Sequence, residues 1–339
     1  MVPRLTGGTV APTIALMNPT TALLARLLRA QPVVIEVGDD VGAWWRAFRA
    51  AEPAPMSPFD RAVVAGFRAD RLAGAFAGGY QGALRTLVPG TLADDDVIAS
   101  FCVSEPGGNS PRAIESRLTL RADGGFTLNG QKRWSTMAPV ASVLLVAAHE
   151  GVDAAGRKRF KLVRVDANAP GVTITRMPSP KFIPEMPHAE LQLKDVAVRP
   201  DALLPGDGYN DYVKRFRTVE DILIHGAVLG YFLSAARRFG FPETVIERTT
   251  SAIVATRALA KLDFGAPETH IALAGTLARD ANLLDHADVH WDKAEEGERV
   301  RWRRDRSGFG SVAGEIRESR RRRAWERLAT QAKDPTTTT

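Results

Sequence analysis

The sequence predicts an α+β protein in which helical segments precede and follow a central β region. Two observations predict this class. Apolar residues recur at helical spacing before residue 97 and after residue 204. Between these points, short alternating or apolar runs are separated by turn-forming residues, which is the pattern of strands. A length of 339 residues allows two or three domains, and we expect boundaries that give 17–96, 97–204 and 205–332.

The N-terminal part predicts helices over 20–29 and 41–51, because apolar side chains there recur on one stripe. Residues 59–87 are rich in alanine and glycine and indicate helix, which a break at Gly78-Gly79 could divide. Residues 1–16 show neither a core pattern nor the cleavage site of a signal peptide. We expect them to be a disordered leader.

The central part predicts a compact β-barrel or sandwich, because many short strands follow one another at close spacing. Turn signals rich in glycine, aspartate and proline separate the runs. The expected strands are 98–104, 116–121, 126–128, 143–148, 160–165, 172–176 and 189–193.

The C-terminal part predicts a four-helix bundle, because helical periods are joined there by short connections. The expected helices are 217–239, 244–262, 268–288 and 310–332. The last residues, 333–339, end in a run of threonines and are expected to be disordered.

Composition excludes several classes of protein. The single cysteine, Cys102, cannot form an internal disulfide and fits a reducing cytoplasm. No apolar run is long enough to predict a membrane span. The formal charge is +6, but the basic residues gather near the C-terminus and alternate with glutamates, which indicates a solvated or acid-paired helix. Nucleic acid is therefore an unlikely partner.

His286 and His290 stand four residues apart, so a helix could present both to a metal ion. No distant third ligand is indicated, and we interpret the pair as a solvated helix end. We predict no metal site.

A strand that runs into a glycine-rich turn is predicted over 101–110, Phe-Cys-Val-Ser-Glu-Pro-Gly-Gly-Asn-Ser. Gly107, Gly108 and Asn109 tolerate a positive φ, and Pro106 fixes the entry to the turn. Such a turn presents backbone N–H groups outward, which suits an anionic ligand such as a diphosphate.

A second segment over 129–136, Asn-Gly-Gln-Lys-Arg-Trp-Ser-Thr, places Trp134 and Thr136 two residues apart. Both could face the same side of a strand. A stacking plane, a hydroxyl group and an anion-binding turn together suggest a flat cofactor that carries phosphate.

These two segments resemble the paired motifs of the acyl-CoA dehydrogenase family of flavoproteins, aromatic-x-(Val/Leu)-(Thr/Ser)-Glu-Pro-Gly-x-Gly-Ser and Asn-Gly-x-Lys-x-Trp-Ile-(Thr/Ser). The resemblance is good over 98–204, patchy in the helices on either side and absent at both termini. It implies N-terminal helices, here shortened, a middle β domain and a C-terminal four-helix bundle. It also implies FAD, an acyl-CoA thioester substrate, an electron acceptor such as an electron-transfer flavoprotein, and assembly into a homodimer or homotetramer.

The resemblance implies a flavin site in the β domain. Phe101, Val103 and Ser104 would line the ring, Ser110 would bind the diphosphate, Trp134 would pack on the ring and Thr136 would bond near its reactive nitrogen. The full set expected to bind cofactor is Phe101, Val103, Ser104, Asn109, Ser110, Trp134, Ser135 and Thr136.

The catalytic base is where the sequence departs from the family. The family's usual late glutamate has no counterpart, and the alternative position on the first bundle helix aligns with Val219. Glu220 and Asp221 are the nearest carboxylates, although only one of two adjacent helical residues can face a pocket squarely. Their other interpretation is as acids of a helical N-terminal turn, favoured by the helix dipole. His225, one turn beyond Asp221, is a further acid–base candidate.

The expected activity is α,β-dehydrogenation of an acyl-CoA thioester, with hydride transfer to the flavin. Two alternatives stay open. The missing glutamate suggests a flavin-dependent oxygenase on the same fold. The shortened helices, and an Arg-Arg-Phe-Gly segment at 237–240 that comes too early to match the family's adenine contact, suggest a catalytically silent homologue that binds flavin or acyl-CoA.

Overall fold

The computed structural model describes residues 18–92, 96–311 and 314–333. The leader expected over 1–16 and residues 334–339 of the expected tail lie outside the described residues. Two units are distinguished, residues 1–31 and 32–339. In the first, helix α1 (Pro19–Arg29) begins at Asn18, whose side-chain oxygen accepts a hydrogen bond from the backbone N–H of Thr20.

The second unit opens with three helices, α2 (Val41–Ala51), α3 (Pro58–Arg68) and α4 (Leu72–Leu87). The break between the last two falls at residues 69–71, so the break considered at Gly78-Gly79 is wrong. Both glycines stand where backbones approach closely. A Cβ on Gly78 would lie 2.3 Å from Ala65 Cβ, and one on Gly79 would lie 2.5 Å from Ile224 Cα. They serve helix packing, and α4 continues through them.

The β region forms one seven-stranded sheet in the order β1-β4-β2-β3-β7-β6, with β5 paired to β4. β1 lies parallel to β4, whereas β2–β3, β3–β7, β4–β5 and β6–β7 are antiparallel. The strands are β1 (Ala99–Cys102), β2 (Arg117–Leu120), β3 (Phe126–Thr136), β4 (Val143–Val152), β5 (Lys158–Asp166), β6 (Val172–Arg176) and β7 (His188–Val198).

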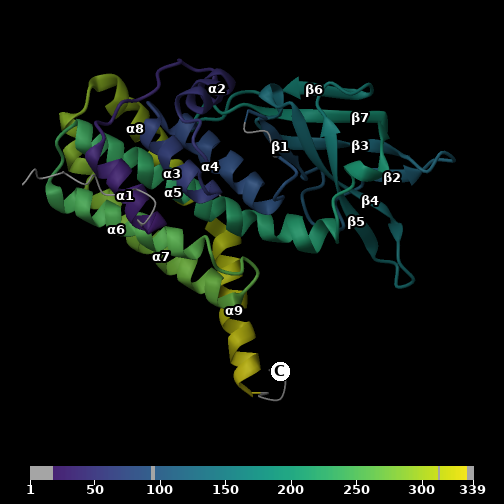
Figure 1. Cartoon of the computed structure of the whole chain (residues 1–339). Helices are drawn as coiled ribbons and strands as arrows, with labels where there is room; N and C mark the ends of the chain where they lie inside the picture. The colour runs from purple at the N-terminus through teal and green to yellow at the C-terminus, as the bar shows by residue number, and fades with distance from the viewer. Residues whose placement is uncertain (1–17, 93–95, 312–313, 334–339) are drawn as a thin grey trace, which may run out of the picture. The chain divides into compact units, whose positions relative to one another are not determined.

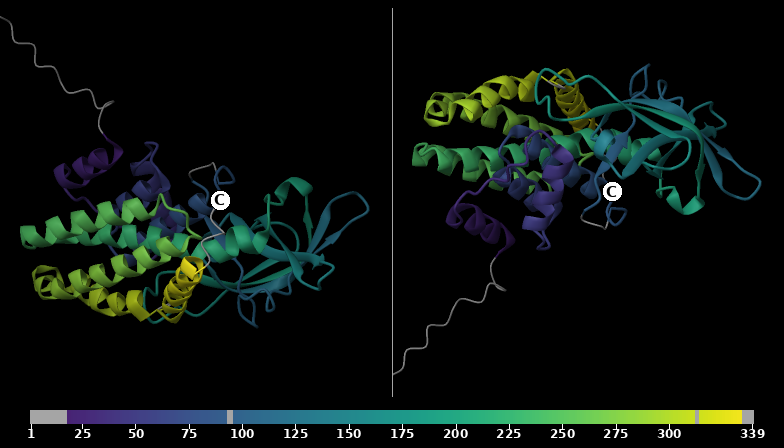
Figure 2. Two further views of the ribbon diagram at one scale, coloured as in Figure 1. Left: turned by 90° about the horizontal axis from the view of Figure 1, so that it is seen from below. Right: turned by 90° about the horizontal axis from the view of Figure 1, so that it is seen from above.

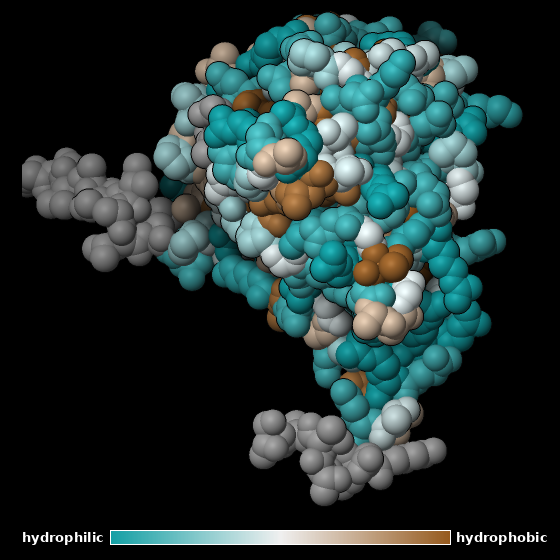
Figure 3. All heavy atoms as spheres, turned by 90° about the vertical axis from the view of Figure 1, so that its right-hand side faces the viewer, coloured by the Kyte–Doolittle hydropathy of each residue, from teal (hydrophilic) through white to brown (hydrophobic). Residues whose placement is uncertain are grey.

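The burial of the sheet differs from strand to strand, since β1 and the first seven residues of β4 are buried on both faces. The side chains of β7 alternate between buried and exposed along much of the strand, as expected of an antiparallel strand with one solvated face. Figure 3 shows the face of the molecule on the β side as mostly hydrophilic, with small separate hydrophobic areas. The apolar side chains between the strands form a core cluster that includes Leu118, Leu144 and Val163.

Helix α5 is the central element of the C-terminal part. A π-helical turn (Gly208–Val213) leads into α5 (Lys214–Arg238), and α6 (Glu243–Leu259), α7 (Pro267–His286), α8 (Glu296–Ser311) and α9 (Gly314–Lys333) follow. In the two views of Figure 2, the strands gather at one end of this unit and α6 and α7 lie toward the other. Figure 1 shows α5 running from the helical part toward the sheet.

The described residues hold five helices after the sheet, where the sequence predicted four. The last predicted helix corresponds to α9, and the arginine-rich segment before it forms the separate helix α8. The predicted α+β class, with helices before and after the strands along the chain, is confirmed.

Among the described residues, only the stretch Gly208–Arg238 is long and apolar enough to cross a membrane, and 89% of its most apolar window is buried inside the protein. The close approach of α3 explains that burial, since a Cβ on Gly230 would lie 2.1 Å from the backbone oxygen of Val63. The stretch is the core helix of this unit.

Candidate active site

A cavity of about 990 Å³ lies within the second unit, where the sheet meets the helices. Its walls come from α4, the strands β1 and β3, the loop between β6 and β7, and the helices α5, α7, α8 and α9. Six of the eight residues expected to bind cofactor line it. They are Phe101, Val103, Ser104, Asn109, Trp134 and Thr136.

The β1 side of the cavity is held by an aromatic group. The backbone N–H of Phe101 donates a 2.9 Å hydrogen bond to Tyr80 Oη on α4. The Phe101 ring packs on Phe216 of α5, with 4.3 Å between ring centroids, and Tyr80 meets Phe216 edge-on at 6.0 Å. These contacts hold strand β1, which bears Phe101, against α4 and α5.

The turn after β1 is closed by its own hydrogen bonds. Gly108 has a φ of +112°, a conformation that glycine adopts readily. Its N–H donates to the Glu105 carbonyl at 2.8 Å. That N–H is therefore committed to the turn and is not offered to a ligand. Ser110 is exposed, does not line the cavity, and accepts from the N–H of Ala113 through its backbone oxygen at 3.0 Å.

A buried ion pair stabilises this turn. Lys132 Nζ lies 2.7 Å from Glu105 Oε1 and donates to the carbonyl of Ala147 at 2.6 Å. Glu105 also accepts from the N–H groups of Glu115 and Ser116 at 2.9 and 3.0 Å. The lysine cation and the two N–H donors hold the pKa of the Glu105 carboxyl below its usual value, against the opposing effect of burial. The Glu and Lys of the two sequence motifs thus join the segments to each other.

Trp134 lies on the cavity wall in a strained conformation. Its φ is +59° and 55% of its surface is exposed, although it belongs to strand β3. The β3–β7 register shifts between Lys132 and Ser135. Thr136 also lines the cavity, whereas Ser135 between them is buried at 1% exposure and does not. The chain leaves the regular strand so that a large aromatic face is presented to the cavity.

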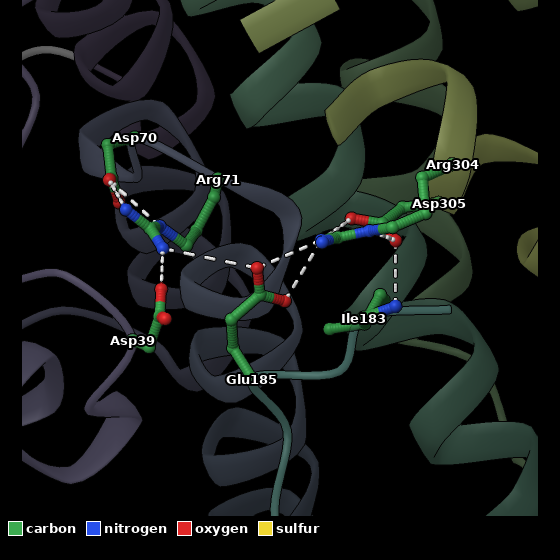
Figure 4. Close-up of polar contacts among 7 residues, drawn as sticks. All are labelled: Asp39, Asp70, Arg71, Ile183, Glu185, Arg304 and Asp305. Atoms are coloured by element: carbon green, nitrogen blue, oxygen red, sulfur yellow. Dashed lines mark hydrogen bonds and ion pairs between the residues drawn. The ribbon is translucent and has the colours of Figure 1, made fainter. Parts of the chain in front are cut away.

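The loop between β6 and β7 covers part of the cavity and is fastened by charges (Figure 4). Glu185 accepts two hydrogen bonds from Arg304 Nη2, at 2.9 and 3.1 Å, and lies 3.9 Å from Arg71 Nη1. The N–H of Ile183, which has φ +46°, donates to Asp305 Oδ1 at 2.7 Å. Helix α8 and Arg71, the residue before α4, are thereby joined to the loop that carries Phe182 and Met186 into the cavity wall.

Glu220 and Asp221 both line the cavity and both are buried. The interpretation of both as acids of a helical N-terminal turn is wrong, because α5 begins at Lys214 and no acidic residue lies in its first turn. Arg217 Nη1 lies 2.8 Å from Glu220 Oε2, and Arg317 Nη2 donates to Asp221 Oδ1 at 2.8 Å. Burial raises the pKa of Glu220 to about 7, and the nearby guanidinium groups offset part of that effect.

His225 lines the same cavity and lies 2.8 Å, Nε2 to Oδ2, from Asp280 on α7. Asp280 also accepts from Arg279 Nε at 2.7 Å. The two hydrogen bonds lower the pKa of the Asp280 carboxyl although burial acts in the opposite direction. Asp280 therefore stays ionised and orients the imidazole of His225.

The sequence did not predict several cavity residues that lie outside the two motif segments. Tyr80, Phe216 and Arg217 line the cavity, as do Arg317 and Arg320 from α9. Arg217 stands three residues before Glu220, and that spacing is the one signal in the sequence that could have singled it out. Arg238 of the Arg-Arg-Phe-Gly segment forms two hydrogen bonds with Glu298, at 3.0 and 2.8 Å, and neither residue lines the cavity.

Comparison with known proteins points to one family. Residues 100–196 match the family model of the acyl-CoA dehydrogenase middle domain. A probable short/branched chain specific acyl-CoA dehydrogenase of Dictyostelium discoideum is 32% identical over 158 residues, which cover 45% of this chain and 35% of that protein. The chain spans less than half the length of the first curated relatives it matches.

Solved structures share the fold. A putative acyl-CoA dehydrogenase of Mycobacterium smegmatis superposes with a TM-score of 0.62 at 20% identity, covering 91% of this chain and 96% of that one. The FAD complex of PigA superposes with a TM-score of 0.59 at 12% identity, covering 91% and 96%. Residues 100–196 thus match the acyl-CoA dehydrogenase middle domain, and the chain shares the fold of solved acyl-CoA dehydrogenases.

Proposed function

We propose that the protein is an FAD-dependent oxidoreductase that dehydrogenates an acyl-CoA thioester at its α and β carbons, with Glu220 as the general base. The observation that carries this proposal is the position of Glu220. It lies on the wall of the same cavity as Phe101, Trp134 and Thr136, and burial raises its pKa to about 7. A base with a pKa near the working pH is the most effective proton acceptor.

The cavity fits a flat cofactor. Its volume of about 990 Å³ is at the upper end of ordinary ligand sites. The exposed indole of Trp134, held at a positive φ, offers a stacking plane, and Ser104, Asn109 and Thr136 offer hydroxyl and amide groups beside it. We infer that these residues hold the flavin ring. FAD, when bound, would supply the hydride acceptor that the reaction needs.

The residues of this chain would handle the proton. Glu220, when ionised, would take the α-proton of the thioester, and Arg217 at 2.8 Å would keep the resulting carboxyl group oriented. Asp221 is bound to Arg317 and is therefore a poorer acceptor, so we assign it a positioning role. The aromatic group of Tyr80, Phe101 and Phe216 would exclude water from the reacting atoms.

Two groups expected to bind the diphosphate of FAD are not placed to do so. Ser110 lies outside the cavity, and the N–H of Gly108 is hydrogen-bonded within its own turn. Assembly into a homodimer or homotetramer, in which a second copy completes the site, is part of the proposal. An electron acceptor such as an electron-transfer flavoprotein and a cytoplasmic location complete it. The single cysteine Cys102 is buried and free, which suits a reducing compartment.

Two alternatives use the same cavity. A flavin-dependent oxygenase would need no α-proton base, and a silent homologue would bind flavin or thioester without turnover. The raised pKa of Glu220 favours the dehydrogenase, since a buried carboxyl group without a catalytic task would be a stability cost.

The visible absorption spectrum of the purified protein, before and after addition of FAD, tests the proposal first. A bound flavin spectrum supports it, and no flavin absorbance in either sample contradicts it. Anaerobic addition of a panel of acyl-CoAs then separates the alternatives. Loss of the flavin colour indicates dehydrogenation. Colour that persists anaerobically, together with oxidation of the substrate in air once the flavin has been reduced with dithionite, indicates an oxygenase. Thioester binding with no reaction in either condition indicates the silent homologue.

A further inference from the structure

Charged residues of α5 and α9 lie on one wall of the cavity, and the arginines among them do not all have a carboxylate partner in the part of the chain that the structure describes. Arg217 Nη1 lies 2.8 Å from Glu220 Oε2, and Arg317 Nη2 donates to Asp221 Oδ1 at 2.8 Å. Each carboxyl group of α5 thus has its own guanidinium partner. Arg320, one turn beyond Arg317 on α9, also lines the cavity and brings a third cation to this wall.

The hydrogen bonds of Arg320 go to neutral groups. Its Nη1 donates to Thr218 Oγ1 at 3.2 Å and its Nη2 to the backbone oxygen of Lys214 at 3.4 Å. Within 18–92, 96–311 and 314–333, no carboxylate approaches its guanidinium within the 4.0 Å of an ion pair. Five N–H donors in a fixed fork suit a carboxylate or a phosphate, so most of the binding capacity of Arg320 is unused.

The next arginine along α9 has a carboxylate partner, whereas Arg320 has none among the described residues. Arg321, the next residue, forms two hydrogen bonds with Glu318 at 2.8 and 2.6 Å. Thr218, which orients Arg320, is itself 3.3 Å from the Nε2 atom of His270 on α7. Burial lowers the pKa of Arg320, which is the direction expected of a guanidinium whose desolvation is not offset by a bound anion.

We propose that Arg320 binds an oxyanion, a carboxylate or a phosphate, of the molecule that occupies this cavity. The inference rests on the proposed function for its ligand class, since the cavity is then the site of a thioester and a flavin nucleotide. The oxyanion has three sources in that class. They are a carboxylate at the far end of the acyl chain, the phosphates of coenzyme A, and the diphosphate of FAD.

Three pairs of probes separate the sources, because each pair differs in one oxyanion-bearing part. Succinyl-CoA and butyryl-CoA differ in the acyl carboxylate, butyryl-CoA and butyryl-pantetheine differ in the phosphate-bearing part, and FAD and riboflavin differ in the phosphates. The dissociation constant of each probe is measured by titration calorimetry with the full chain. The variants are Arg320→Gln, Arg320→Lys and, as a matched loss of charge on the exposed side of α9, Arg323→Gln.

The expected result is that Arg320→Gln weakens the oxyanion-bearing probe of one pair by about 10- to 100-fold, as for a charge-assisted hydrogen bond. The other probe of that pair should stay within about twofold. Arg320→Lys should recover part of the loss, because it restores the charge without the fork. Arg323→Gln should change no constant by more than about twofold.

Equal weakening of both probes in every pair, or no weakening in any pair, overturns the proposal. So does the absence of oxyanion-dependent binding to the unaltered protein. Retention of the unfolding midpoint by Arg320→Gln or Arg320→Lys shows that the constants belong to folded protein. The readout is equilibrium binding, so it is distinguishable from the proposed function, which fails when bound flavin is not reduced by any thioester.

Discussion

Arg217 Nη1 lies 2.8 Å from Glu220 Oε2, yet the contact lacks the geometry of a hydrogen bond. The cation therefore lies beside the carboxyl group without occupying its lone pairs. Burial outweighs this cation and raises the pKa of Glu220 to about 7. A carboxyl group that is both oriented and free to accept a proton is the arrangement on which the proposed chemistry depends.

The raised pKa predicts how stability depends on pH. The fold favours the protonated form of Glu220, so this stabilising contribution is full below the ordinary value of 4.5 and is lost as pH rises through about 7. Relative to the unaltered protein, Glu220→Gln should gain on the order of 1–3 kcal/mol between pH 4 and pH 8.5. Urea unfolding at the two pH values measures the gain, with exposed Glu190→Gln as control. A difference independent of pH would sink the pKa assignment.

Trp134 is predicted to matter for cofactor binding and little for stability. Its side chain is 55% exposed, so Trp134→Ala should change the free energy of unfolding by less than about 1 kcal/mol. The same change removes the stacking plane and should weaken FAD at least about tenfold. Trp325→Ala is the matched control, because Trp325 is 53% exposed and does not line the cavity. Equal FAD affinity in both variants would contradict the placement of the ring.

Lys132→Met should destabilise the fold by about 3–5 kcal/mol, because it leaves the Glu105 carboxylate buried without its partner. The double variant Lys132→Met/Glu105→Gln should recover part of that loss, since neither charge is then left alone. Unfolding midpoints of the two single variants and the double variant measure the coupling. Additive losses would show that the two motif segments are not joined through this pair.

Glu185→Gln should loosen the loop that covers the cavity, because its two hydrogen bonds to Arg304 lose the carboxylate charge. Amide hydrogen exchange over residues 178–187 should accelerate by about tenfold, while the sheet core stays protected. Glu190→Gln on the adjacent strand removes a comparable charge from an exposed pair and should leave the loop unchanged. Unaltered exchange in Glu185→Gln would assign the loop's rigidity to other contacts.

The β domain was the part most accessible from sequence. Residues 172–176 form β6 within the predicted bounds, and 41–51 form α2 likewise, because turn or capping residues mark both ends. The break after α3 and the separate helix α8 were not foreseen. Glycine weakens helices in isolation, yet Gly78 and Gly79 permit packing that more than offsets this, and α8 lacks the apolar stripe by which a helix is recognised.

The candidate site, too, was predictable from the sequence only in part. Phe101 and Trp134 belong to local motifs, so their sequence context sufficed to bring them to one cavity. Asp280, which orients His225, and Arg317, which binds Asp221, come from helices far along the chain. Such pairs depend on how the helices pack, and no local pattern encodes them.

Anaerobic reduction of the bound flavin by an acyl-CoA, followed against pH, tests the central claim most directly. For the unaltered protein we predict a reduction rate that rises through pH about 7 as Glu220 ionises. We predict a rate at least about 100-fold lower and without this titration for Glu220→Gln. A flavin that stays oxidised at every pH, or one that Glu220→Gln reduces as fast as the unaltered protein does, would contradict the account.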